Sequence, residues 1–321
     1  MSPPTTQSPS STQSPSRTQF RRGSGAFGSA WIWFYSGVDV VAVDWSGRRI
    51  GERKYIWTAR VRGGELIELR NGQTRAEVID ELIAAPSGRD SRLVVGLDFA
   101  FSCPAWYLRQ RQLASARALW ELATTQGESW LAACEAPFWG RPGFRRPELA
   151  QHFRRTELAV AAAGGIGPKS VFQIGGAGAV GTGTVRGLPS LLALQHAGFS
   201  IWPFDPPATR TVVEIYPRLL TGPVIKRSQM AREAYLAESA TWLPPELARF
   251  ATSNEDAFDA AVSAIVMSEH ASALSLLDQT TDPETWLEGQ IWAPPTASAR
   301  AYWPAPRGVA APPIRAVKGR S

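Results

Sequence analysis

Short apolar runs separated by turn residues predict strands in the first third of the chain. The first run, VDVVAVDW at 38–45, has the continuous apolar character of a strand buried on both faces, and the turn Ser46–Gly47 follows it. Two more runs, at 54–62 and 65–70, flank Gly63–Gly64, which has the composition of a two-residue hairpin loop. The pattern therefore predicts one buried strand followed by a β-hairpin.

A helix and a further strand are predicted after the hairpin. Thr74 has the spacing of an N-cap with Glu77 as its capping-box partner, and the helical pattern over 74–85 ends at Pro86. The run RLVVGLDF at 92–99 is again strongly apolar. The order strand, hairpin, helix, strand predicts an α/β fold with a mixed sheet.

The middle of the chain, 102–205, is long and mostly helical by its pattern. Leu, Ala, Trp and Arg recur at helical spacing through its first part, and a Gly-rich segment follows Lys169. We interpret this stretch as an insertion between the fourth and fifth strands. Beyond it, TVVEIY at 211–216 predicts the fifth strand, and 254–277 is the clearest helix of the sequence.

Three acids interrupt strands that are otherwise apolar, namely Asp44, Asp98 and Glu214. A lone buried carboxylate is costly unless it meets a cation or several hydrogen-bond donors. Asp44 and Asp98 fall near the carboxyl ends of their strands, where open α/β sheets bind ligands. Because clustered carboxylates repel and a hard divalent cation relieves that repulsion, we expect Mg²⁺ or Mn²⁺ there. Two such ions about 4 Å apart can activate water in phosphodiester hydrolysis.

The last helix carries Asp256 and Asp259, whose spacing puts both side chains on one helix face. Thr252 and Glu255 have capping-box spacing, and acids in a first turn favour the helix dipole. A structural role therefore explains Asp256 about as well as a functional one does. Asp259 lies deeper, among apolar residues, which favours a functional role for it.

The net charge of +6 is concentrated near the two ends of the sequence. Residues 1–38 contain three arginines, the segment after Glu288 contains five cations, and neither contains an acid. These eight cations exceed the net charge, so the rest of the chain is slightly acidic. Both end segments are rich in Pro, Ser or Ala, which is typical of disordered tails and equally compatible with segments that contact polyanions.

Within the rest of the chain, the densest basic cluster contains four residues that we consider as candidate phosphate contacts: Arg145, Arg146, Arg154 and Arg155. An exposed helix face explains this cluster equally well.

Four segments of the sequence resemble the motifs of domain-of-unknown-function family 429, which is described as predicted RNase H-like nucleases. These segments are VAVDWSG at 41–47, VVGLDFAFSCP at 94–104, VVEIYP at 212–217 and EDAFDAAVSA at 255–264. A further segment, KSVFQIGGAGAVGTGTVRG at 169–187, is similar to a stretch found in one branch of that family. The resemblance implies an RNase H-like mixed five-stranded sheet flanked by helices, with the hairpin forming the second and third strands. RuvC-like resolvases share the same style of site.

The resemblance also implies which acids form the active site of a metal-dependent nuclease acting on DNA or RNA. By motif they are Asp44, Asp98, Glu214, Asp256 and Asp259, and all except Glu214 are expected to bind metal. The resemblance covers about 38–277, and together with the composition it predicts a domain over 38–285 between basic tails at 1–37 and 286–321. The long insertion departs from a minimal RNase H domain, and a fold does not establish a reaction.

The segment Gly176–Gly181 satisfies the GxGxxG pattern of dinucleotide-binding folds. In such folds the helix begins at the third glycine, whereas Thr182–Gly187 continues the flexible composition. We therefore expect no nicotinamide cofactor. The same loop could surround a phosphate with its amides, assisted by Lys169, Thr182 and Arg186.

Two alternative functions follow from these features. One is an ATP-binding phosphotransferase of the actin and sugar-kinase type, which shares the general fold and also begins with a strand ending in an acid and a Gly-containing turn. The other is a nucleic-acid-binding protein with an RNase H-like fold and no turnover.

Cysteine usage and hydropathy predict a cytoplasmic location. Cys103 and Cys134 have no CxxC spacing, so neither a disulfide framework nor a zinc site is indicated. The apolar stretch at 31–45 is too short and too polar for a membrane span, and no signal-peptide pattern precedes it. We expect no membrane partner and no haem.

Overall fold

The computed structural model describes residues 37–86, 92–164, 167 and 169–295. The predicted N-terminal tail lies outside the described residues apart from Gly37, as does the predicted C-terminal tail beyond residue 295. None of the helices in the described part of the chain combines the length and the apolar character needed to cross a membrane.

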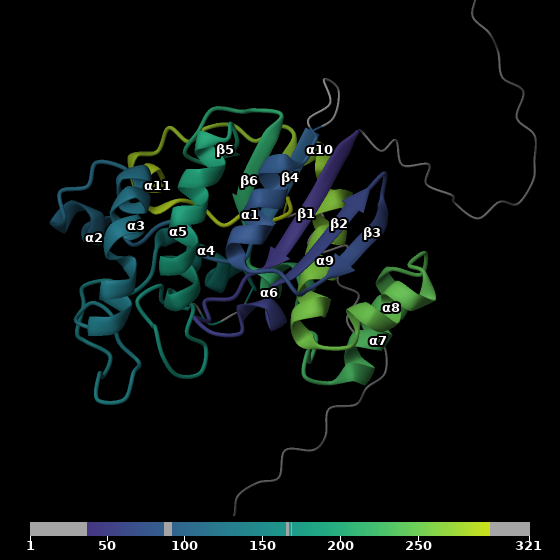
Figure 1. Ribbon diagram of the computed structural model, residues 1–321, viewed down its shortest axis with the longest axis horizontal. Helices are drawn as coiled ribbons and strands as arrows, with labels where there is room; N and C mark the ends of the chain where they lie inside the picture. The colour runs from purple at the N-terminus through teal and green to yellow at the C-terminus, as the bar shows by residue number, and fades with distance from the viewer. Residues whose placement is uncertain (1–36, 87–91, 165–166, 168, 296–321) are drawn as a thin grey trace, which may run out of the picture. The chain divides into compact units, whose positions relative to one another are not determined.

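A mixed six-stranded sheet forms the centre of the fold, in the order β3-β2-β1-β4-β6-β5 (Figure 1). The strands are β1 (Val38–Asp44), β2 (Trp57–Arg62), β3 (Glu65–Arg70), β4 (Arg92–Leu97), β5 (Ser200–Ile201) and β6 (Arg210–Glu214). The α/β class is confirmed, but the predicted count of five strands is wrong. The additional strand is β5, an edge strand of two residues that is too short to leave a periodic pattern in the sequence.

The predicted hairpin is present and sets the antiparallel half of the sheet. β1 pairs antiparallel with β2, β2 pairs antiparallel with β3, and β1, β4 and β6 run parallel. Gly63 and Gly64 have φ values of 58° and 84°. A two-residue turn with positive φ at both positions matches the twist of the flanking strands, and glycine adopts it without steric cost.

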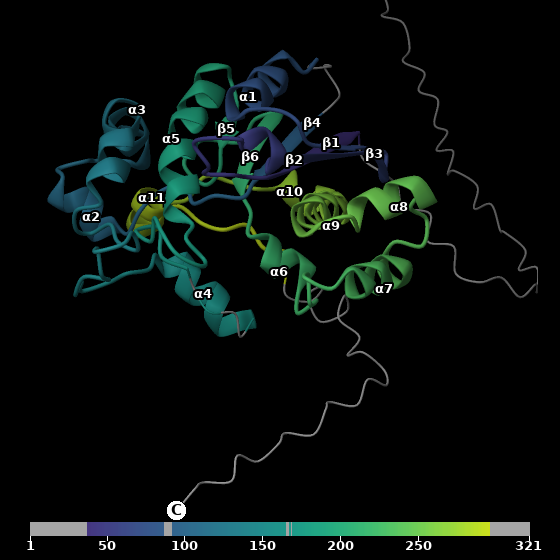
Figure 2. The same ribbon diagram turned by 60° about the horizontal axis from the view of Figure 1, so that its bottom comes forward.

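The helices that precede residue 200 in the sequence are α1 (Arg75–Ala84), α2 (Ala105–Gln110), α3 (Ala116–Ala133), α4 (Arg155–Gly164) and α5 (Gly181–His196). Two of them, α1 and α5, cover one face of the sheet. Figure 2 shows α1 and α5 on this face, and α3 packs against α5. The capping box of α1, with Thr74 and Glu77, is formed as predicted.

The stretch 102–205 builds this core and is not an appendage to it. Trp120 of α3 and Leu188 of α5 are buried in the same hydrophobic cluster as Val41 and Val95 of the central strands. The segment lies between β4 and β6, where the insertion was expected, and it also supplies much of the core on one face of the sheet.

The opposite face is covered mainly by α9, which carries two of the predicted acids. The helices after β6 are α6 (Pro217–Thr221), α7 (Gln229–Ser239), α8 (Pro245–Ala251), α9 (Glu255–Glu269), α10 (Ala271–Leu274) and α11 (Pro283–Glu288). Phe258, Ala261 and Val262 of α9 share a core cluster with Val40 and Val94. This packing fixes the position of α9 against the central strands.

Gly96 of β4 allows α9 to approach the sheet closely. A Cβ at this position would lie 2.6 Å from the sulfur of Met267 and 2.9 Å from Ile215. Any other residue would therefore require a shift of the side chains between β4 and α9.

Both ends of α9 differ from the prediction. The N-cap is Asn254, whose Oδ1 accepts a hydrogen bond from the Ala257 amide at 2.8 Å, so Thr252 is not the capping residue. The predicted helix over 254–277 is interrupted at His270, and α10 follows as a separate short helix.

The predicted start of the C-terminal tail, at residue 286, also lies too early. Residue 286 is inside α11. Ile291 forms an isolated bridge with Glu214, and the Trp292 amide donates to the Glu214 carbonyl oxygen at 2.8 Å. The chain therefore packs along β6 until close to residue 295, with Trp292 buried.

Candidate functional site

Two acids lie side by side at the carboxyl edge of the sheet. Asp44 is the last residue of β1, and Asp98 directly follows β4. The two strands are parallel neighbours in a register that pairs Val43 with Leu97, and the Asp98 amide donates to the Val43 carbonyl at 3.1 Å. Parallel strands end at the same edge, so this register brings the two side chains together as the sequence predicts.

The helix α9 brings two further acids to the same edge. Asp256 and Asp259 lie in its first turns, and α9 packs against β1 and β2. Asp256 is partly buried and Asp259 is buried, with 8% of the residue exposed. Both charges act on Asp44, so the strand acids and the helix acids form one electrostatic group.

Burial and mutual repulsion raise the pKa values of this group. Burial raises the pKa of Asp98 to about 8, and the charges of Asp259 and Glu214 add to the increase. Burial raises the pKa of Asp259 to about 6, against the opposing effect of a lysine. The pKa values of Asp44 and Asp256 are also raised, first by burial and then by neighbouring carboxylates.

Asp44 and Asp98 act on each other directly, and the charge of Asp98 raises the pKa of Asp44. A hydrogen bond between two carboxyl groups requires that one of them carries a proton, because an ionised carboxylate only accepts. Such a bond between Asp44 and Asp98 would place a proton on one of them, and their protons would be lost in coupled steps.

Lys226 is the cation of this group, and sequence reasoning missed it. Its Nζ forms an ion pair with Oδ2 of Asp259. Its charge lowers the pKa values of Asp44, Asp98 and Asp256 as well. Lys226 lies in the irregular segment between α6 and α7, where no periodic pattern marks a residue as facing inward.

The donors of this group suit a hard divalent cation in chemical type. Carboxylate oxygens are the ligands that Mg²⁺ and Mn²⁺ prefer. Oδ1 of Asp259 is buried and has no hydrogen-bond partner among the described atoms. However, within the described ranges no three His, Cys, Asp or Glu side chains converge closely enough to hold a metal ion. The donor chemistry fits, and the present side-chain positions do not yet form a coordination shell.

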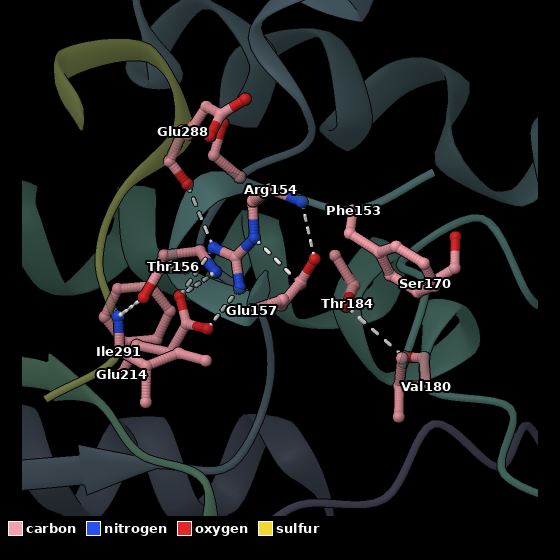
Figure 3. Close-up of polar contacts among 12 residues, drawn as sticks. Phe153, Arg154, Thr156, Glu157, Ser170, Val180, Thr184, Glu214, Glu288 and Ile291 are labelled. Carbon is pink, nitrogen blue, oxygen red and sulfur yellow. Dashed lines mark hydrogen bonds and ion pairs between the residues drawn. The ribbon is translucent and has the colours of Figure 1, made fainter. Parts of the chain in front are cut away.

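Glu214 belongs to a different, neutralised cluster. Its carboxylate forms two hydrogen bonds with the guanidinium of Arg154 (Figure 3), one of them between Nη1 and Oε2 at 2.8 Å. It also accepts a hydrogen bond from the Phe101 amide at 2.9 Å. Arg154 also pairs with Glu157 at 3.0 Å and donates to the Glu288 carbonyl at 2.9 Å. Glu214 pairs in the sheet with Leu97, the residue before Asp98, and both of its carboxylate oxygens accept hydrogen bonds.

Arg154 is not part of a surface, contrary to the expectation for the basic cluster. Its side chain is 1% exposed, because it is the shared partner of two buried carboxylates. Arg155 is exposed and pairs with Asp282 at 2.8 Å. Arg145 and Arg146 are exposed, and Arg146 lies over the ring of Trp139. The four arginines therefore do not form one phosphate-binding surface.

The helix α5 begins at Gly181, which corrects the expectation that the flexible run continues to Gly187. Val185, Leu188 and Leu191 are buried on one helix face, and this packing outweighs the weak helix propensity of the glycines. The segment before the Gly-rich turn forms only an isolated bridge between Trp139 and Gln173 and is not a strand of the sheet. The strand–turn–helix setting of a dinucleotide-binding fold is therefore not formed.

The start of α5 lies against the turn that follows Asp44. A Cβ on Gly47 would lie 2.3 Å from the Gly183 amide nitrogen, so only glycine permits this approach. A cavity of about 250 Å³ adjoins the contact and is lined by Asp98, Lys169 and Thr182, among others. Arg186, expected as a phosphate contact, instead pairs with Glu128 at 2.6 Å.

A second cavity also borders Asp98. Its volume is about 500 Å³, and it is lined by the acids Asp98, Asp259 and Glu255, the cations Arg218, Lys226 and Arg227, and Tyr216. Asp98 and Tyr216 line both cavities. Asp98 therefore lies at the border of two cavities.

Comparison with known proteins gave no match, whether against protein-family models, curated proteins or solved structures.

The raised pKa of Asp98 predicts that the metal-free protein loses stability as pH rises. The unfolded chain releases this proton near the ordinary pKa of 3.8 and the folded chain near 8, so the loss accumulates between these values. In EDTA at pH 8, Asp98→Asn should therefore raise Tm, by roughly 3–6 °C, and the gain should disappear toward pH 4. Thermal unfolding followed by circular dichroism measures this. Asp80→Asn, on the exposed side of α1, is the control, and a destabilised Asp98→Asn protein at pH 8 would contradict the account.

The cluster around Arg154 predicts a large stability effect at this position. Arg154→Met leaves Glu214 and Glu157 buried without their cation, which should cost about 3–5 kcal/mol of unfolding free energy. Arg155→Met removes an exposed ion pair and should cost less than about 0.5 kcal/mol. Urea unfolding of the two variants provides the comparison. Equal midpoints would show that the buried ion pairs do not hold the fold together.

Proposed function

We propose that the protein is a divalent-metal-dependent nuclease that hydrolyses phosphodiester bonds of DNA or RNA on an RNase H-like fold. The observation that carries the proposal is the electrostatic grouping of Asp44, Asp98 and Asp259 at one edge of the sheet, where burial and neighbouring carboxylates raise their pKa values. Natural cores avoid buried like charges because they raise the free energy of the folded state. A cluster that persists in spite of this cost is typical of a functional site.

The sheet supports the RNase H-like assignment. Its hairpin β2–β3 lies beside β1, and its parallel strands β1 and β4 carry the acids at their carboxyl ends. The helix α9 supplies the remaining acids from one face. This arrangement agrees with what the resemblance to family 429 implies.

The metal set of the proposal comprises Asp44, Asp98, Asp256 and Asp259. When bound there, Mg²⁺ or Mn²⁺ supplies Lewis acidity and a nucleophilic water near neutral pH. Because the pKa values of Asp44 and Asp98 are raised, a proton held by either carboxyl group would be released when the two act as ligands. Asp259 offers the buried Oδ1 that has no partner among the described atoms.

Glu214 has a supporting role in this proposal. Both of its oxygens are held by Arg154 and the Phe101 amide. It fixes the segment after β4 next to Asp98, and its charge adds to the raised pKa of that residue.

One observation favours a phosphotransferase as the second candidate. The helix α5 starts at the third glycine of the Gly-rich segment, next to the cavity that contains Lys169 and Asp98. Helix N-termini preceded by glycine-rich turns suit phosphate groups. ATP could therefore place its phosphates near the acids in such an enzyme.

A cleavage panel tests the nuclease proposal. Single-stranded, duplex, branched and RNA–DNA hybrid substrates are incubated with Mn²⁺ and either the wild-type protein or Asp44→Asn. At least one substrate should be cut by the wild type, and Asp44→Asn should be slower by more than about 100-fold while its Tm in EDTA is unchanged or higher.

Other outcomes of the same panel point to the other functions. ATP hydrolysis without nucleic-acid cleavage would favour the phosphotransferase. Salt-sensitive binding of nucleic acid without metal-dependent cleavage would favour a non-catalytic binding protein. Equal cleavage by the wild type and Asp44→Asn would contradict the assigned site.

A further inference from the structure

Lys226 is placed where a metal ion would be expected. Its ammonium group pairs with Oδ2 of Asp259, and its side chain lines the cavity that also contains Asp98. Lys226 and Asp259 are both largely buried, with 18% and 11% of their side chains exposed. The ion pair therefore lies inside the site and not on the outer surface of the protein.

The backbone around Lys226 is held by two arginines. Arg218 Nη1 donates to the Val224 carbonyl at 2.7 Å. Arg232, buried on α7, donates through Nη1 to the Lys226 carbonyl and through Nε to the Thr252 carbonyl at 3.0 Å. Arg232 thus ties the Lys226 segment to the chain just before α9, which carries Asp259. The ion pair is a built part of the fold and not a chance contact of a long side chain.

The negative charge that the four aspartates can carry exceeds the positive charge of Lys226. Four carboxyl groups, those of Asp44, Asp98, Asp256 and Asp259, act on one another, and Lys226 opposes the charge of each. One ammonium cannot neutralise four carboxylates, and its ion pair engages only one oxygen of Asp259. A divalent cation would compensate more of this charge and would accept oxygens from several acids at once.

We propose that Lys226 is an internal counter-ion that takes the place of the divalent cation in the metal-free protein and must move aside before the metal binds. This inference rests on the proposed function in that the acids are taken as metal ligands. An ammonium and a divalent cation repel each other at contact distance. The lysine side chain is flexible, and the adjoining cavity of about 500 Å³ gives it a place to move to.

The inference accounts for how part of the negative charge is compensated without a divalent cation. Lys226 pairs with Asp259, and its charge also acts on Asp44 and Asp98. Exchange of Lys226 for a cation with two charges would allow the helix acid and the strand acids to share one ion. Lys226 thereby stabilises the protein while no metal is bound and weakens the first binding of metal.

Titration of the intact protein with Mn²⁺ in the absence of nucleic acid tests the inference, with free Mn²⁺ measured by electron paramagnetic resonance. Lys226→Met should bind Mn²⁺ at least about tenfold more tightly than the wild type, because a competing charge is removed. Lys226→Arg keeps the charge and should bind no more tightly than the wild type. Arg227→Met is the matched control, because it removes a neighbouring cation from the same cavity; its affinity should change less than about threefold.

A second measurement guards against a folding defect in the first variant. The Tm of Lys226→Met and of Lys226→Gln is measured in EDTA and with saturating Mn²⁺. Both variants should be less stable than the wild type in EDTA and should gain more than the wild type when Mn²⁺ is added.

Unchanged or weaker Mn²⁺ affinity in Lys226→Met and Lys226→Gln would overturn the inference, and so would an absence of Mn²⁺ binding in every variant. A variant that binds Mn²⁺ more tightly while no form of the protein cuts nucleic acid would support the inference and remove the nuclease proposal. The two claims can therefore fail separately.

Discussion

Repulsion between carboxylates at the carboxyl edge of the sheet is the constraint on which the rest of the site depends. The parallel register of β1 and β4 places Asp44 beside Asp98, and the packing of α9 adds Asp259 and Asp256. None of these acids can move far without disturbing the two hydrophobic cores that hold the strands and the helix. Their charge must therefore be compensated by protons, by Lys226 or by a bound cation.

In the neighbouring cluster around Arg154, the charges of the buried carboxylates are compensated by a buried cation. Glu214 and Glu157 are also buried, but both are paired with Arg154 and receive backbone hydrogen bonds. That cluster joins β6, α4 and the segment before α4, and its polar atoms are satisfied by one another (Figure 3). The aspartate group is different because it retains an unpaired oxygen and borders two cavities. The first arrangement holds the fold together, whereas the second remains able to bind a ligand.

The parts of the site that lie on regular elements could be predicted from the sequence. Asp44 and Asp98 end apolar runs, where a charged residue is unexpected. Asp259 stands among the apolar residues of α9, a helix that is buried along most of its length. Lys226 could not be predicted because it lies in an irregular segment, where its direction depends on Arg218 and Arg232. The burial of Arg154 was missed for a similar reason, since its partner Glu214 is 60 residues away in sequence. Long-range partners of this kind leave no local pattern.

The central claim, that the aspartates share a divalent cation, is tested most directly by anomalous X-ray scattering from crystals of the intact protein soaked in Mn²⁺. The account predicts an anomalous peak within about 2.5 Å of carboxylate oxygens of both Asp44 and Asp98, with the Lys226 side chain turned away from Asp259. A Mn²⁺ peak elsewhere in the molecule, or none at this edge while Lys226 keeps its ion pair, would contradict it.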